Sequence, residues 1–331
     1  MNSLRPKILY VLSLTISLGI LAYLLSTQIN YSQLKCQIQH FTGKTWALLA
    51  VSAIFGLVYR FFVARQLKYQ LGPSISTFSV YKIHLISTFY SLAIPSELLG
   101  GGVSWYLFSK KVDSKSRIAY SMAITKLVYY ISLIPVASIA FVLEPRLKNY
   151  SVQWGILLVS IVISAAYIFF FTKMHFYFKE FIDKFVKPER RAGPIARLYI
   201  QFWNTIEEFN NESTFSKVHL WTYSLFIQLA NVGSLYFILV STNLNFPVSA
   251  AFWIIPFLAL IHALPITFCG FGAREMGLIF FLKELYGFTP EASLLVSILI
   301  MLNTVLIGVF LGGFFSLIAN IHISKSQKAT L

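Results

Sequence analysis

Four ionisable side chains lie within stretches of the sequence that are otherwise strongly apolar: Glu97, Lys126, Arg274 and Glu275. An ionised side chain at the centre of a membrane helix costs at least about 2.5–3.5 kcal/mol, so such a group requires a partner or a water-filled cavity. Basic groups at that depth can bind an anion such as a lipid phosphate. We therefore predict that Lys126 and Arg274 meet a phosphate group, and that Glu97 and Glu275 orient the two bases or carry a coupling proton.

Three of these groups follow residues that are typical of helix starts. Glu97 comes after Ser96, a good N-cap residue. Arg274 and Glu275 come after Gly272. The first turn of a helix carries partial positive charge and free backbone N–H groups, which favours an anion or a carboxylate over a guanidinium. Arg274 is therefore expected to contact the anion or an acidic partner such as Glu97. The alternative is that the ionisable groups only form a buried network between helices.

Prolines and glycines interrupt two apolar runs, one in each half of the chain. The residues predicted to shape the binding site at these breaks are Pro95, Gly100, Gly101 and Gly102 in the first, and Pro265, Gly270 and Gly272 in the second. Consecutive glycines each weaken a helix by about 1 kcal/mol, so the first run should turn back within 95–102. Two such breaks that enter from opposite faces indicate an inverted-repeat transporter with its site near the membrane midplane. A kinked helix is the alternative at either proline.

The composition places these breaks in a membrane protein. The chain of 331 residues is 57% hydrophobic and only 12% charged, against about 25% charged in soluble domains. Runs close to the roughly 20 apolar residues that cross a bilayer occur at 8–25, 45–63, 77–94, 118–142, 152–171, 218–240, 249–264 and 291–318. We predict an all-α, polytopic integral membrane protein with about six full transmembrane helices. Two opposed, re-entrant helical hairpins, 77–117 and 249–286, complete this inverted-repeat-like fold.

The distribution of Lys and Arg indicates the orientation, because short cytoplasmic loops are enriched in basic residues. If 77–117 turns back, most basic residues, including Arg60, Arg65 and Lys68, fall on the cytoplasmic side. If it crosses once, most basic residues fall on the outer side. This favours the hairpin, with both termini cytoplasmic. The same test barely discriminates for 249–286. The net charge of +15 then faces anionic lipid, and we expect no nucleic-acid partner.

Two further stretches have recognisable patterns. The polar connection 173–217 contains an apolar stripe formed by Leu198, Phe202, Ile206 and Phe209. Such a stripe is typical of a helix that lies in the cytoplasmic interface, and a solvated loop is the alternative. Gly308 and Gly312 form a GxxxG pair in the last apolar run, which favours close packing against another helix.

Several kinds of chemistry find no support in the sequence. There is no GxxxxGK[ST] loop, no HExxH motif and no GxSxG elbow, and the only aspartates, Asp113 and Asp183, are too far apart for a DxD metal site. Cys36 is likewise far from Cys269, so no CxxC metal motif exists. Lone histidines on apolar helices, here at 84 and 262, are more often hydrogen-bonded to a neighbour than metal ligands. We expect no metal, no cofactor, no catalytic residues and no enzymatic activity.

Two motifs carry a resemblance to a known family. LPITFCGFGAREMG, residues 264–277, is similar to the signature, roughly LPIS-x-GG-x-G-x-REG, of the lysylphosphatidylglycerol synthase transmembrane-region family, a flippase-like domain also found as standalone membrane proteins. IPSELLGGGVSWYLFSKK, residues 94–111, resembles the family's earlier proline and double-glycine motif. Lys126, in ITKLVYY, stands where the family usually has a basic residue.

The chain departs from the family pattern after the double glycine. An acidic residue often follows there, with an arginine a few residues later; this chain has Gly102 and then Trp105 or Tyr106, although Lys110 and Lys111 follow. A headgroup contact from that arginine is therefore not expected here.

The resemblance implies lipid translocation by one flippase-like transmembrane domain over 1–331. In two-part family members, a soluble acyltransferase-like domain adds an amino acid to the lipid, and the membrane region carries the product across. This chain ends at Leu331, shortly after the last apolar run, so we expect the translocating part without aminoacyl transfer.

The expected substrate is a phospholipid or glycolipid with an anionic or phosphate-bearing headgroup, in the inner or plasma membrane. A homo-oligomer or a lipid-synthesis enzyme is a possible partner. The alternative is a non-transporting assembly factor, or a transferase accessory, for envelope glycolipid synthesis.

Overall fold

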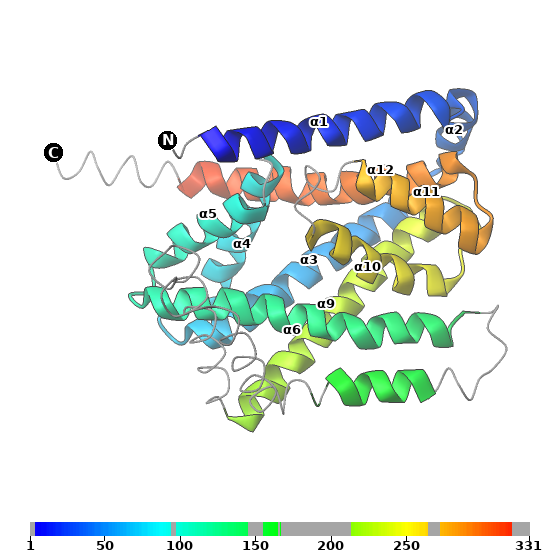
Figure 1. The fold of residues 1–331 in the computed structure, drawn as a ribbon. Coiled ribbons are helices and arrows are strands. Elements are labelled where there is room, and N and C mark those ends of the chain that lie inside the picture. The colour runs from blue at the N-terminus through cyan, green and yellow to red at the C-terminus, as the bar shows by residue number, and fades with distance from the viewer. Residues whose placement is uncertain are drawn as a thin grey trace, which may run out of the picture.

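The computed structural model describes residues 4–93, 97–144, 155–164, 166, 213–263 and 272–319. Every regular element in these residues is helical, which confirms the predicted all-α class (Figure 1). The start of the first helix and the end of the last one lie at the same end of the bundle (Figure 1). The connection predicted to lie in the interface, 173–217, falls almost entirely outside the described residues.

The described residues form a succession of helices of different lengths. Their bounds are α1 Leu4–Thr27, α2 Tyr31–Gln39, α3 Gly43–Leu71, α4 Thr77–Ala93, α5 Glu97–Ser109, α6 Lys115–Val142, α9 Thr214–Ser241, α10 Val248–Ala263, α11 Ala273–Tyr286, α12 Pro290–Val305 and the π-helical η2 Leu306–Gly312. Within the described residues, four helices are long and apolar enough to cross a membrane: 43–71, 117–142, 214–241 and 290–319. The protein is therefore a polytopic membrane protein by helix length and composition.

Helices α3 and α9 form the centre of the bundle as an antiparallel pair. Gln66 donates a hydrogen bond to the Leu220 carbonyl oxygen, whereas Ser52, earlier in α3, lies 3.0 Å from the later Ser234 hydroxyl of α9. A Cβ at Gly233 would lie 2.7 Å from the ring of Phe55. The small residues therefore let the two backbones approach closely, which is how membrane helices pack without a hydrophobic driving force between them.

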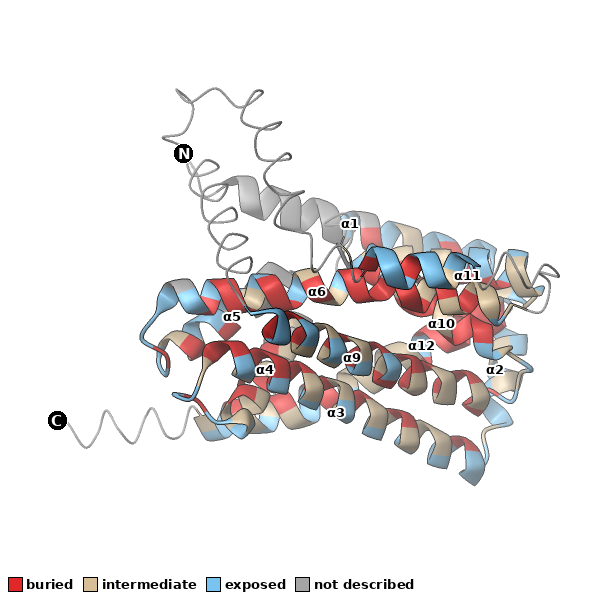
Figure 2. Cartoon of the chain, turned by 90° about the horizontal axis from the view of Figure 1, so that it is seen from below, coloured by how far each residue is buried: buried red, intermediate tan, exposed pale blue. Residues whose placement is uncertain are grey.

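Two apolar clusters of buried residues stabilise the bundle. One joins buried residues of α6, α9, α10, α11 and α12, and the other joins buried residues of α3, α4, α5, α6 and α9. Tyr129 of α6 packs against both clusters. The buried residues of α6, α9 and α10 face the interior, and exposed residues lie on the outer sides of these helices (Figure 2).

The first interrupted segment is a pair of packed helices, α4 and α5. Lys111, just after α5, donates a hydrogen bond of 3.3 Å to the hydroxyl of Ser79, near the start of α4. The outer ends of the two helices therefore lie together, as in an antiparallel pair.

The predicted turn was too long. Because α5 begins at Glu97, Gly100, Gly101 and Gly102 are helical residues and not part of the break. The packing of α5 on α4 and α6 overrides the weak helix propensity of glycine.

The second interrupted segment is also an antiparallel pair, α10 and α11, separated by 264–272 as the sequence predicts. The hydroxyls of Ser249 and Tyr286, at the outer ends of the two helices, lie 3.4 Å apart and both donate to Glu144 Oε2. Glu144 follows the end of α6, whereas α6 begins just after the first pair. The outer ends of the two pairs therefore lie at opposite ends of α6.

Helix α12 continues through η2 to Ala319 and packs closely on α4. A Cβ at Gly312 would overlap the Leu85 carbonyl oxygen and lie 2.9 Å from Phe89 Cβ. This close approach explains the glycine, as the GxxxG pattern predicts.

Gly312→Ala is expected to lower the free energy of unfolding by about 1–3 kcal/mol, because α12 or α4 must shift to admit the methyl group. Gly313→Ala is the matched control, since its Cβ would meet only the Phe89 ring at 3.4 Å. Thermal unfolding of the detergent-solubilised protein measures both. Equal stability of the two variants would contradict the close contact.

Candidate functional site

A cavity of about 360 Å³, here called the outer cavity, lies between α3, α4, α5, α6, α9 and α10. Its polar lining includes Gln66, His84, Ser104, Thr125, Lys126 and His262. Lys126, Tyr130 and His262 both line this cavity and are exposed, so the cavity opens on the outside of the bundle where these residues lie. Helices of both interrupted segments contribute to its wall.

A second cavity of about 230 Å³, here called the inner cavity, lies between α3, α6, α9, α10, α12 and η2. It shares Tyr59, Tyr129, Ala259 and His262 with the outer cavity, so the two adjoin. Arg60, Asn231 and Asn303 contribute polar groups to its wall. Together the cavities form an interior with polar groups in a largely apolar wall, and it extends from Lys126 to α12.

The charged groups that the described residues contribute to this interior are positive. They are Arg60 and Lys126, and the described lining residues include no aspartate or glutamate. Cationic side chains in a cavity wall attract anions and repel cations. The site therefore suits an anionic group.

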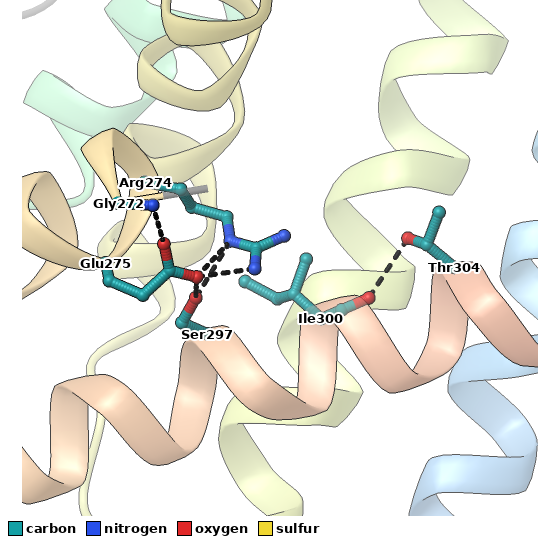
Figure 3. A network of polar contacts seen from close by, with 6 residues as sticks. All are labelled: Gly272, Arg274, Glu275, Ser297, Ile300 and Thr304. Carbon is teal, nitrogen blue, oxygen red and sulfur yellow. Dashed lines mark hydrogen bonds and ion pairs between the residues drawn. The ribbon is translucent and has the colours of Figure 1, made fainter. Parts of the chain in front are cut away.

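Arg274 and Glu275 form a separate, closed cluster at the start of α11 (Figure 3). Arg274 Nε lies 3.0 Å from Glu275 Oε1 and 2.8 Å from the Ser297 hydroxyl of α12, which itself donates to Glu275 Oε1 at 2.7 Å. Both charged side chains are buried, with exposed fractions of 7% and 5%. Within the described residues, Arg274 thus pairs with its own neighbour in the sequence.

The other carboxylate oxygen of Glu275 caps the helix. Glu275 Oε2 accepts a hydrogen bond of 2.7 Å from the backbone N–H of Gly272, at the first turn of α11. A carboxylate there is favoured by the positive end of the helix dipole. Glu275 therefore stabilises both Arg274 and the start of α11.

The structure brings only part of the predicted site together. Gly101 and Lys126 line the outer cavity. Gly272, Arg274 and Glu275 lie in the closed cluster and are not among the residues that line either cavity. Gly100 and Gly102 lie in α5. The side chain of Glu97 and the residues Pro95, Pro265 and Gly270 lie outside the described part of the chain. The predicted contact between Arg274 and Glu97 therefore stays a prediction.

Sequence reasoning missed three polar residues of the interior: Arg60, Gln66 and Asn303. Arg60 was predicted to lie among the cytoplasmic basic residues, but α3 extends to Leu71 and buries it, with 8% exposed. The sequence did contain a signal for two of these residues, because Arg60 and Asn303 each lie within an apolar run. The helix face that a residue occupies depends on packing, and this decides whether it points at a cavity.

The fold defines a polytopic α-helical membrane protein, and its two cavities have cationic groups among their described lining residues. The sequence matches the family described as the lysylphosphatidylglycerol synthase TM region over residues 10–312. Because the match covers most of the chain, the protein belongs to this family, as the two sequence motifs indicate, and has a lipid-related membrane function. No curated protein matches the sequence.

Proposed function

We propose that this protein is a lipid translocase, flippase-like or scramblase-like, and not an enzyme. An anionic or phosphate-bearing headgroup would enter the outer cavity while its acyl or isoprenoid chains stay in the bilayer. The membrane family and the positive cavity wall both support this function.

The single observation that carries the proposal is the position of Lys126. It lies 11 residues after Lys115, or about 17 Å along a helix about 42 Å long, and is thus close to the middle of a membrane-spanning helix. At this depth a lysine is costly unless it is paired or lines a polar path. Lys126 is exposed and also lines a cavity.

We also infer that both interrupted segments are re-entrant hairpins from opposite faces of the inner or plasma membrane. Helix α4 is about 26 Å long, α5 about 20 Å, α10 about 24 Å and α11 about 21 Å, all short of a hydrocarbon core of about 30 Å. Their outer ends lie at opposite ends of α6. With the basic residues inside, this arrangement gives cytoplasmic termini.

The test is transport by the full chain in proteoliposomes that contain a trace of fluorescent phospholipid, quenched from outside by dithionite. Wild-type protein is expected to carry fluorescent lipid from the inner to the outer leaflet, where dithionite quenches it. Lys126→Gln should slow the initial rate by about tenfold, the loss of one charge-assisted contact. Lys115→Gln, the same change at an exposed position at the start of α6, should keep the wild-type rate.

Two outcomes would contradict the proposal. One is the absence of wild-type transport for phosphatidylglycerol, phosphatidylethanolamine and a glycolipid analogue alike. The other is a Lys126→Gln rate equal to that of wild type. The first outcome would favour the assembly-factor alternative. The position of Lys126 in the wall of a cavity that opens on the outside of the bundle supports the translocase.

A further inference from the structure

Arg60 is a buried cation whose partners in the structure are not anionic. Its Nη1 donates a hydrogen bond of 2.9 Å to the Gly56 carbonyl oxygen, and its guanidinium carbon lies 5.6 Å from the centroid of the Tyr59 ring. Within the described part of the chain, no carboxylate forms an ion pair with Arg60. A guanidinium has five N–H donors, and this hydrogen bond uses one of them.

The position of Arg60 in the membrane makes an unneutralised charge costly. Arg60 is 11 residues before the end of α3 at Leu71, or about 17 Å along the helix axis, and is 8% exposed. Buried charges are retained when they are paired, coordinate an ion or line a polar pathway. Because Arg60 lines the inner cavity, an anion in that cavity is the neutralising partner that the structure leaves room for.

Asn303 adds a second unsatisfied group to the same cavity. Its Nδ2 donates to the hydroxyls of Ser52, at 2.9 Å, and Ser234, at 3.1 Å, whereas its Oδ1 is buried and has no hydrogen-bond partner. Asn303 and Arg60 are neighbours across Gly56, since a Cβ there would lie 3.5 Å from Arg60 Nη1 and 3.9 Å from Asn303 Nδ2. A ligand bound here can accept hydrogen bonds from Arg60 and donate one to Asn303.

We propose that the inner cavity is a binding site for a phosphate group, held by Arg60, with Asn303 accepting a hydrogen bond from a hydroxyl or amine of the same ligand or from its bound water. The planar fork of a guanidinium matches two oxygens of a phosphate group. A volume of about 230 Å³ is much larger than a monatomic anion needs, since about 10–15 Å³ on a comparable measure holds one water. The phosphate belongs either to a lipid headgroup or to free inorganic phosphate.

The experiment measures binding by the shift in melting temperature of the full chain in detergent, because a ligand that binds only the folded state raises it. The probes are inorganic phosphate, dihexanoylphosphatidic acid and, as a control at equal ionic strength, sodium chloride. We expect stabilisation by at least one phosphate probe and none by chloride. Stabilisation by inorganic phosphate shows that the phosphate group suffices, and stabilisation by the short lipid alone shows that the headgroup of a lipid is required.

Arg60→Gln is expected to weaken binding of that probe by about tenfold or more. Arg65→Gln, the same change at an exposed position later in α3, should leave the affinity unchanged. Without ligand, Arg60→Gln should melt at or above the wild-type temperature, because it removes a buried charge that lacks an anionic partner. Arg60→Lys keeps the charge but loses the fork, and should bind several-fold more weakly than wild type while remaining folded.

The proposal is overturned if neither phosphate probe stabilises the wild-type protein, or if Arg60→Gln and Arg60→Lys bind as tightly as wild type. It is also overturned if ligand-free Arg60→Gln melts well below wild type, because Arg60 would then serve a structural role. The measurement involves no lipid transport, so its failure is separate from a failure of the translocase function.

Discussion

Replacing Glu275 by glutamine is expected to lower the free energy of unfolding by about 3–5 kcal/mol, the usual cost of removing one member of a buried ion pair. The change removes the carboxylate that pairs with Arg274, accepts from Ser297 and caps α11 at Gly272. The remaining guanidinium, 7% exposed, then lies in a medium that does not solvate it. Thermal unfolding in detergent, compared with wild type, measures the loss.

Two controls separate the charge from the shape of this cluster. The double variant Arg274→Gln with Glu275→Gln removes both charges and should recover much of the lost stability, because no unpaired charge remains. Ser297→Ala should cost about 1.5–3 kcal/mol, the range for hydrogen bonds to charged groups. A Glu275→Gln variant as stable as wild type would show that the pair does not hold α11 to α12.

The same double variant bears on function. Because Arg274 and Glu275 are not among the residues that line the two cavities, the folded double variant is expected to keep lipid transport within a few-fold of wild type. Its initial rate in proteoliposomes, beside that of Lys126→Gln, distinguishes a structural cluster from a headgroup site. A loss as large as that of Lys126→Gln would place Arg274 on the transport path.

The second large effect is expected for Gly272→Ala, with a loss of about 2–5 kcal/mol. Gly272 has φ 81° and ψ −57°, a conformation that L-residues rarely adopt. An added Cβ would also lie 2.9 Å from the Ser17 carbonyl oxygen of α1 and 3.0 Å from Ile20 Cβ. Backbone strain and overpacking therefore add.

Gly287→Ala is the matched control, because Gly287 also has a positive φ, 71°, but nothing lies within 4 Å of where its Cβ would be. Its expected loss is about 1–2 kcal/mol, from backbone strain alone. The difference between the two variants, measured by thermal unfolding, reports how closely α1 packs on the start of α11. Equal losses would mean that α1 does not approach Gly272.

The start of α11 could be read from the sequence, because Gly272 directly precedes it and adopts a positive φ that favours glycine. Pro95 lies outside the described residues, but the predicted turn to Gly102 was too long. Gly100 to Gly102 have low helix propensity, yet they lie within α5. Local propensity is a weak preference, and the packing of α5 on α4 and α6 outweighs it.

The residues of the candidate site also differ in whether the sequence alone could predict their role. Lys126 could be found from the sequence, since a lysine within an apolar run is costly anywhere in a membrane. Arg274 and Glu275 have the same signal, but their opposite charges satisfy each other through a contact with Ser297, 22 residues after Glu275. Arg60 was assigned to a loop, because its burial follows from the length of α3 and from the cavity beside it.

The sequence by itself determined the membrane class, the all-α fold, the family and the cost of placing Lys126, Arg274 and Glu275 within apolar runs. These features follow from composition, from local backbone preferences and from the cost of charge in hydrocarbon, none of which requires knowledge of distant neighbours. Only the tertiary structure decided which charges are paired and which line a cavity. That outcome depends on the rotation and crossing of each helix, which is set by close contacts between residues far apart in the chain.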